Sequence, residues 1–486
     1  MTPERASARK HWLGFLVACL ALWAVALAAA AGGLAGLTVA LRIVASGLVL
    51  GAWALIFKCG PRRLLLSPLT HLAAFALLFY GWFPAFSVVL MDLNLNEGLF
   101  ATRDNYHFVA SYVGSRSELL VVGFAGLCLG AFAIAAAMLS EYRRADTSDF
   151  RYQSPYTIGW GAIAGIICLM LVLALSASPQ FSALLGAPIG KELFSATPVL
   201  FSFSCAFLIS TFGSKRRGHV LLGFLVIISG LFLLTFVNRA QMPLLITYAL
   251  VSFIITLISL SARQLTLIAL SCAIFLSAIM VALVVFRPAQ ATYAPATLMQ
   301  RILIMAEQKL LTRQAVSAGC FNKIADLGFE KDAGGNPFYF VVAVVPRVLW
   351  REKPNLSRGS EFAELCGEGG AFEAGHSESI TVLGEPILED GYRGLVVAEV
   401  TLVVALVVLS VFGLTGGPVR MLWLVALLPW LIAVEQHFAL YVANAFKMGL
   451  ILVPAALALH WVLGRLAMPV SSSDDEAARS ARLGVG

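Results

Sequence analysis

The chain has 486 residues, of which 59% are hydrophobic and only 13% are charged, and its mean hydropathy is +0.87. Soluble globular proteins are far less apolar, so the composition excludes that class and predicts an all-helical polytopic membrane protein. The formal net charge of +7 does not indicate a nucleic-acid partner, because no stretch supplies a basic face on a soluble domain.

The N-terminal residues 1–10 are basic, and an apolar run over 12–31 follows them. At about 1.5 Å per residue this run is long enough to cross the ~30 Å hydrocarbon core of a membrane. Its last part, AVALAAAAGG, also resembles a signal-peptide cleavage region. A second apolar run begins almost at once, and we expect the first to remain as an uncleaved helix.

Apolar runs of membrane-spanning length recur along the chain and predict about twelve spans. After the first, they fall near 34–57, 64–91, 119–140, 156–176, 197–213, 220–237, 244–262, 264–286, 394–413, 421–437 and 444–463.

Lysine and arginine set the predicted orientation of these spans. With the N-terminus in the cytoplasm, most basic loop residues fall in short cytoplasmic loops and in the C-terminal tail. The short loops on the other side hold only Arg103, Arg116, Lys191, Arg239 and Lys447. Because basic residues are retained in the cytoplasm, both termini are expected there.

Four regions follow from this layout. Spans one to nine occupy residues 1–286, a large outward loop covers 287–393, spans ten to twelve occupy 394–463, and a polar, disordered cytoplasmic tail covers 464–486. In a Gram-negative cell the large loop would face the periplasm.

The large loop is expected to lie over the bundle as a lid. Residues 297–315 predict an amphipathic helix, 338–345 are apolar but too short to span, and 367–375 form a Gly-rich connection. Such pieces cannot build a core of their own, so we expect them to pack on the membrane helices and close a cavity. A lid over a lipid-facing cavity implies a lipid-borne substrate.

Cationic residues are frequent in the lid and would suit an anionic head group, because guanidinium binds phosphate oxygens in bidentate fashion. They are Arg287, Arg301, Arg313, Arg347, Arg351, Lys353, Arg358 and Arg393.

Charged residues within or near the spans add further candidates. Arg239 lies at the outer end of a span, where it either binds a ligand or reaches the interface. Arg42 is interpreted as structural, and Glu399 and Glu435 as partners of arginines rather than catalytic groups.

The eight cysteines show no metal-ligand spacing, and those that lie singly in apolar runs are interpreted as small core residues. Cys320 and Cys366 differ because both fall in the outward loop. A disulfide between them is allowed outside the cytoplasm, and the sequence leaves its formation open.

Two motifs in the large loop carry a resemblance to a known family. PRVLWREKPN at 346–355 is followed by ESITVLGEPILEDGYRG at 378–394. Together they resemble the outward loop of bacterial O-antigen polymerases of the Wzy type and related oligosaccharide repeat-unit polymerases. There, a Pro-Arg-x-(Leu/Ile)-Trp-x-x-Lys-Pro element precedes a Ser-x-Thr-x-x-Gly-Glu-x-x-x-x-x-Gly-x-x-Gly element. The matching residues here are Pro346, Arg347, Leu349, Trp350, Lys353, Pro354, Ser379, Thr381, Gly384, Glu385, Gly391 and Gly394.

This chain departs from the family pattern in two places. The family's outward arginine after a mid-chain span corresponds to Arg239, without the flanking glycines. The spacing from Arg347 to Gly359 is one residue longer than the family's arginine-to-glycine spacing.

The resemblance implies a GT-C-like glycosyltransferase of the bacterial inner membrane, acting in lipopolysaccharide biosynthesis. It would transfer a growing glycan from an undecaprenyl diphosphate carrier to the terminal sugar of a second carrier-linked repeat unit. Membrane lipid, a chain-length regulator and a flippase are the further partners it implies. The sequence has no nucleotide-sugar domain and no Asp-x-Asp element in its outward loops. No cofactor and no metal are therefore expected.

The predicted site divides into two groups of residues. The diphosphate would be held by Arg239, Arg287, Arg347, Lys353 and Arg393. The acceptor hydroxyl would lose its proton to Glu385, or else to Glu378 or His376.

Simpler roles stay open for the same residues. Arg347 and Lys353 would also serve to anchor the loop to lipid phosphates, and Glu385 would also serve in a turn or a helix cap. Alternative functions are an O-antigen ligase, a lipid-linked oligosaccharide flippase or other transporter, and a structural assembly partner.

Overall fold

The computed structural model describes the chain in several segments. These are residues 3–92, 103–141, 198–207, 209, 241–257, 313–330, 336, 338–345, 350, 352, 358–367 and 380–466. Throughout these segments the secondary structure is helical and contains no strand.

Five of the described helices are long and apolar enough to cross a membrane. They cover Arg9–Ala31, Thr38–Lys58, Pro68–Leu90, Arg116–Leu139 and Thr381–Thr415. The chain is therefore a helical membrane protein, as its composition predicts. The expected spans at 156–176, 220–237 and 264–286 lie outside the described residues, as do positions 197, 208 and 210–213 of the span expected at 197–213.

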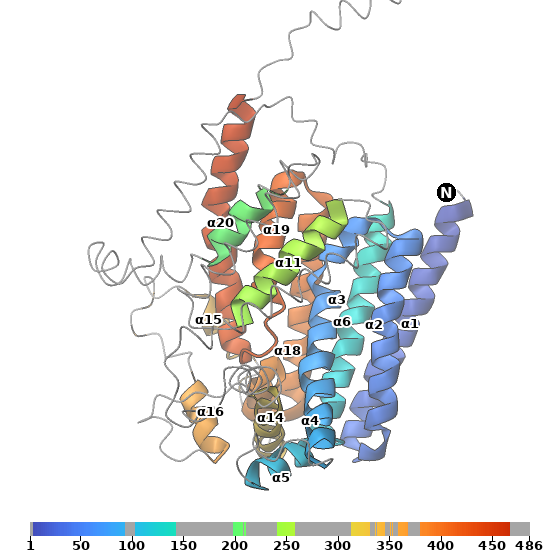
Figure 1. The fold of residues 1–486 in the computed structure, drawn as a ribbon, viewed down its shortest axis with the longest axis vertical. Coiled ribbons are helices and arrows are strands. Elements are labelled where there is room, and N and C mark those ends of the chain that lie inside the picture. The colour runs from blue at the N-terminus through green and yellow to red at the C-terminus, as the bar shows by residue number, and fades with distance from the viewer. Residues whose placement is uncertain are drawn as a thin grey trace, which may run out of the picture.

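The N-terminal helices lie side by side along the bundle (Figure 1). They are α1 (Pro3–Ala31), α2 (Thr38–Cys59), α3 (Pro68–Leu77), α4 (Phe83–Asp92) and α6 (Arg116–Glu141). Helix α6 is central, with 89% of its apolar window buried, whereas α1 and α2 have only 28% of theirs buried. The exposed apolar side chains of α1 and α2, such as Leu13, Val17 and Leu50, form a face suited to lipid.

The span expected at 64–91 corresponds to one candidate membrane helix, Pro68–Leu90, which contains a π-helical segment. A 3-10 helix, η2 (Arg62–Leu66), precedes α3, and a π-helical segment, η3 (Leu78–Trp82), joins α3 to α4. Pro68 occupies the first turn of α3, where its missing N–H costs no hydrogen bond.

The remaining described helices are mostly short, and only α18 and α20 are as long as α1. They are η1 (Ala35–Leu37), α5 (Arg103–Tyr112), a helix at Pro198–Phe207, α11 (Gln241–Leu257), α14 (Arg313–Glu330), α15 (Val341–Val344), α16 (Gly359–Leu365), α18 (Thr381–Thr415), α19 (Pro418–Leu431) and α20 (Phe438–Leu466). Helices α5, α14 and α16 gather at one end of the bundle, away from the start of α1 (Figure 1). The start of α1 and the end of α20 lie toward the opposite end, so both lie on the same side.

The C-terminal half also departs from expectation at two helix boundaries. Helix α18 begins at Thr381, well before the expected span at 394–413. Helix α19 ends at Leu431, whereas the expected span continued to 437. Residues 432–437 are not helical, and most of them are buried. They therefore pack inside the protein instead of reaching the surface.

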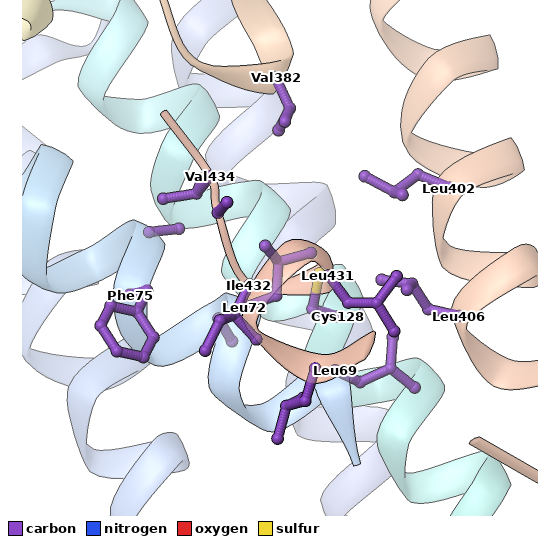
Figure 2. Packing of buried hydrophobic residues seen from close by; sticks show 14 of the residues in the cluster. Leu69, Leu72, Phe75, Cys128, Val382, Leu402, Leu406, Leu431, Ile432 and Val434 are labelled. Carbon is purple, nitrogen blue, oxygen red and sulfur yellow. The ribbon is translucent and has the colours of Figure 1, made fainter. Parts of the chain in front are cut away.

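This junction between α19 and α20 is part of the hydrophobic core. Figure 2 shows Leu431 and Ile432 beside Leu72 of α3, with Leu402 and Leu406 of α18 on the other side of Leu431 and with Val434 toward Phe75. The backbone N–H of Val382, at the start of α18, donates to the carbonyl of Val434 at 3.1 Å. The core therefore holds the start of α18 and the end of α19 together.

A buried ion pair lies between α2 and α6. Arg42 Nη1 is 2.7 Å from Glu118 Oε1, and these side chains are 6% and 1% exposed. The guanidinium also donates to the carbonyl of Gly81 at 2.7 Å and lies 4.8 Å from the Trp82 ring centroid. Glu118 Oε2 accepts from the N–H of Gly114 at 2.8 Å. Arg42 is thus structural, as expected, and its partners come from the π-helical segment η3 and from α6.

A disulfide joins Cys320 of α14 to Cys366 at the end of α16, with 5.2 Å between their Cα atoms. Formation of this bond, left open by the sequence, is thus confirmed. Cys19, Cys128 and Cys205 are free and buried, in agreement with their predicted role as small core residues.

Candidate functional site

Glu385 lies in the second turn of α18 and is buried, with a side chain only 1% exposed. Its Oε2 accepts a hydrogen bond from the N–H of Ala439 at 2.8 Å. Ala439 is in the first turn of α20, whose free N–H groups and dipole favour a carboxylate. Glu385 Oε1 lies 3.5 Å from Arg358 Nη1. The carboxylate is therefore fixed between a helix N-terminus and a guanidinium.

Arg358 precedes α16 and contacts three carboxylates. Its Nε and Nη2 donate to the two carboxylate oxygens of Glu361 at 2.8 and 2.6 Å, and its Nη1 donates to Glu389 at 2.5 Å. The hydrogen bonds to Glu361 and Glu389 raise the pKa of the guanidinium above its ordinary value. Arg358 therefore stays charged. Its own side chain is 25% exposed, so it links buried Glu385 to the surface.

Glu385 and Glu389 lie one helical turn apart on α18 and so share one face of the helix. With Glu361 they place three carboxylates around one guanidinium, which leaves this cluster negative when all are ionised. We call Arg358, Glu361, Glu385 and Glu389 the Arg358 cluster.

Tyr339 lies close to the Arg358 cluster. Burial raises the pKa of its phenol above the ordinary value, and the negative charges of Glu385 and Glu389 raise it further. The next residue, Phe340, packs edge to face on Phe438 at the start of α20, with ring centroids 4.9 Å apart. The apolar segment at 338–345, expected to be too short to span, is thus docked on the bundle by α15 and its flanks.

A second group of polar side chains comes from the α19–α20 junction. Gln314 of α14 donates to Glu435, and Asn444 of α20 donates to Gln436 at 2.6 Å. The His437 ring packs against Phe362 of α16 at 5.5 Å. Since Arg358 also lies over the Phe362 ring at 5.3 Å, this ring lies between the two groups.

The disulfide fixes the element that carries Arg358. Cys366 is at the C-terminal end of α16, and Cys320 lies on α14 beside buried Ile324 and Phe362. Helix α16 is therefore held covalently at its end and by the ion pairs of Arg358 at its start.

Among the expected catalytic residues, Glu385 lies in this cluster, and Glu378 and His376 lie outside the described residues. Of the expected diphosphate ligands, the structure describes Arg393. Its side chain is 66% exposed and lies 3.5 Å from Asp390, beyond a break in α18. No described contact joins it to the Arg358 cluster. Arg239, Arg287, Arg347 and Lys353 lie outside the described residues.

The interpretation of Glu399 as a partner of an arginine finds no support in the described contacts. Glu399 accepts a hydrogen bond from Trp23 Nε1 at 3.2 Å, and Glu435 accepts one from Gln314. Apolar helices surround Glu399, so an indole donor satisfies it without a second buried charge.

Several site residues were not singled out from the sequence, namely Glu361, Glu389, Tyr339 and Asn444. Because residues 377–393 were expected to belong to the outward loop, the one-turn spacing of Glu385 and Glu389 did not indicate a shared helix face. A helix boundary at Thr381 would have placed both on one face next to the basic segment that contains Arg358.

The arrangement can hold a proton acceptor in place. One oxygen of Glu385 is occupied by the Ala439 N–H, and the other is near a guanidinium whose position Glu361 fixes in bidentate fashion. Within the described part of the chain, no group of three or more His, Cys, Asp or Glu side chains is placed to hold a metal ion. The chain matches no protein-family model, no curated protein and no solved structure.

Proposed function

We propose that the protein is a membrane glycosyltransferase of the polysaccharide-polymerase type. It would act on the side of the membrane where α5, α14 and α16 gather, in the bacterial inner membrane with both termini cytoplasmic. The substrates would be two undecaprenyl-diphosphate-linked glycans, one as donor and one as acceptor.

The observation that supports this proposal most is the setting of Glu385. A buried carboxylate with one oxygen held at 2.8 Å and the other 3.5 Å from a guanidinium is suited to general-base work. It also falls within one of the two sequence motifs that resemble the polymerase family.

The proposed reaction is a displacement at the anomeric carbon of the donor sugar. The acceptor hydroxyl forms the new glycosidic C–O bond as the bond to the carrier diphosphate breaks, and Oε1 of Glu385 takes the hydroxyl proton. Arg239, Arg287, Arg347, Lys353 and Arg393 would stabilise the departing diphosphate. Positioned cations of this kind stabilise developing charge without a divalent ion.

Access to Glu385 requires movement of the side chains over it, because it is only 1% exposed. Arg358 is the partly exposed contact of that carboxylate and would position it. Substrate binding would shift its guanidinium and open the path to Oε1.

The test separates a proton acceptor from a helix cap. Glu385→Gln keeps a side-chain oxygen for the Ala439 N–H but removes the charge and the basicity. In cells that lack the gene, the wild-type copy should restore a long glycan ladder on a gel, and E385Q should leave core bearing a single repeat. A general base contributes about 10²–10⁴-fold to a rate, so the loss should be clear.

Glu389→Gln is the matched control, because it lies on the same helix face and contacts the same arginine. It should retain a ladder. A wild-type ladder from E385Q, at equal protein level in the membrane, would show that Glu385 is only a cap.

The deletion strain itself separates the alternative functions. Collapse to a single repeat on the core supports a polymerase. Long polymer that stays on the carrier indicates a ligase, and single repeats accumulating on the inner leaflet indicate a transporter.

A further inference from the structure

Helix α18 is interrupted after its first turns. Asp390 and Gly391 have non-helical backbone angles, with φ 56° and ψ −139° at Gly391. This positive φ is accessible to glycine and strained for other residues. The break leaves Thr381–Glu389 as a short helix of its own, whose carbonyl groups point toward the break. This end also carries the negative end of the helix dipole.

Two glycines bring other backbone close to these carbonyls. A Cβ placed on Gly394 would lie 2.3 Å from the Pro386 oxygen and 3.1 Å from the Asp390 Cβ. A Cβ placed on Gly328 of α14 would lie 2.3 Å from the Ile387 oxygen. The Pro386 carbonyl and the Asp390 side chain therefore both lie beside Gly394, and the Ile387 carbonyl lies against Gly328.

Asp390 is buried there without a hydrogen-bond donor. Its side chain is 0% exposed, and neither carboxylate oxygen has a hydrogen-bond partner. Its described ion pair is with Arg393, whose Nε lies 3.5 Å from Oδ2 and whose side chain is 66% exposed, so this positive charge is largely in solvent. A buried carboxylate at the negative end of a helix is unfavourable unless a positive charge compensates it.

We propose that the break in α18 binds a monovalent cation of the size of sodium. Asp390 would supply the charged ligand, and the carbonyl oxygens at the end of the short helix would supply neutral ones. Broken helices in membrane proteins bind Na⁺ through unwound carbonyls and helix C-terminal ends. A single carboxylate balances one positive charge, whereas calcium sites draw on several carboxylates. Arg393, which the proposed function places at the diphosphate, borders this site, but binding of the cation does not require glycosyl transfer.

The test uses the full-length protein purified in detergent. Its midpoint of thermal unfolding is measured in NaCl and in N-methyl-D-glucamine chloride at equal ionic strength. Binding to the folded state alone should raise the midpoint by about 3–5 °C at a hundredfold excess of Na⁺ over its Kd. Asp390→Asn should abolish this rise.

Two variants serve as controls. Glu389→Gln removes the neighbouring carboxylate, which pairs with Arg358, and should keep the Na⁺-dependent rise. Arg393→Gln removes the competing cation and should enlarge it. Equal midpoints for the wild type in the two salts, or an unchanged rise in D390N, would overturn the proposal. Stabilisation by Ca²⁺ or Mg²⁺ but not by Na⁺ would overturn the monovalent assignment.

Direct binding decides the question if D390N does not fold. The wild type should retain ²²Na⁺ in a saturable way, displaced by excess unlabelled NaCl. Absence of saturable binding would refute the site.

Discussion

Glu118→Gln should strongly destabilise the fold, because it leaves Arg42 charged and buried without its counterion. The two carboxylate oxygens accept from Arg42 and from the Gly114 N–H, so glutamine keeps one of these hydrogen bonds and places an NH2 donor at the other position. Removing one partner of a buried ion pair costs about 3–5 kcal/mol. Arg42 retains the Gly81 carbonyl and the Trp82 ring, so we expect a loss of about 3 kcal/mol in the free energy of unfolding.

The assay is equilibrium unfolding of purified protein in mixed micelles titrated with SDS, followed by circular dichroism. Arg42→Met and the double variant R42M/E118Q complete a double-mutant cycle, and the pair should couple by about 2–3 kcal/mol. Glu364→Gln is the control, because Glu364 is exposed on α16, and it should change stability by less than about 0.5 kcal/mol. An E118Q variant within that range of wild type, or additive single effects, would refute the structural role of the pair.

Two further predictions concern the packing of α14. Replacing Cys320 and Cys366 by serine opens a loop of 46 residues, so chain entropy predicts a loss of about 4 kcal/mol in the free energy of unfolding. The measurement is the unfolding midpoint without reductant, which should be lower in the double serine variant. Equal midpoints for this variant and the oxidised wild type would count against the prediction. Gly328→Ala should lower the unfolding midpoint by several degrees or prevent folding, because its Cβ would lie 2.3 Å from the Ile387 oxygen. The control is Gly47→Ala on α2, where the added Cβ has nothing within 4 Å and should be neutral or stabilising. Similar midpoints for the two alanine variants would contradict the close approach of α14 to α18.

The membrane helices were predictable where the signal is local. Spans expected at 12–31, 34–57 and 119–140 correspond to α1, α2 and α6, because length and apolar composition alone decide them. The end of α19 was not predictable in this way. The apolar run continues beyond Leu431, and the helix stops because the Val434 carbonyl bonds to Val382, far away in the sequence.

The candidate site shows the same division. Glu385 was found from a motif, but its surroundings depend on long-range contacts with Arg358 and with Ala439 of α20. The partner of Arg42 is separated from it by 76 positions, which no local pattern reveals. Residue identity thus predicted candidate residues for the site, but tertiary packing determines which of them come into contact.

The short helix α19 has a consequence for how the protein is made. Its 14 residues extend about 21 Å, less than the ~30 Å of a hydrocarbon core. Inserted alone, it would carry the polar junction at Glu435, Gln436 and His437 into lipid, where unsatisfied polar groups are costly. We therefore expect the hairpin of α19 and α20 to assemble against helices that are already in place, among them α11 and α18, which pack on α19. Truncations that end between α19 and α20 should be degraded before assembly, even though α18 alone is long enough to insert.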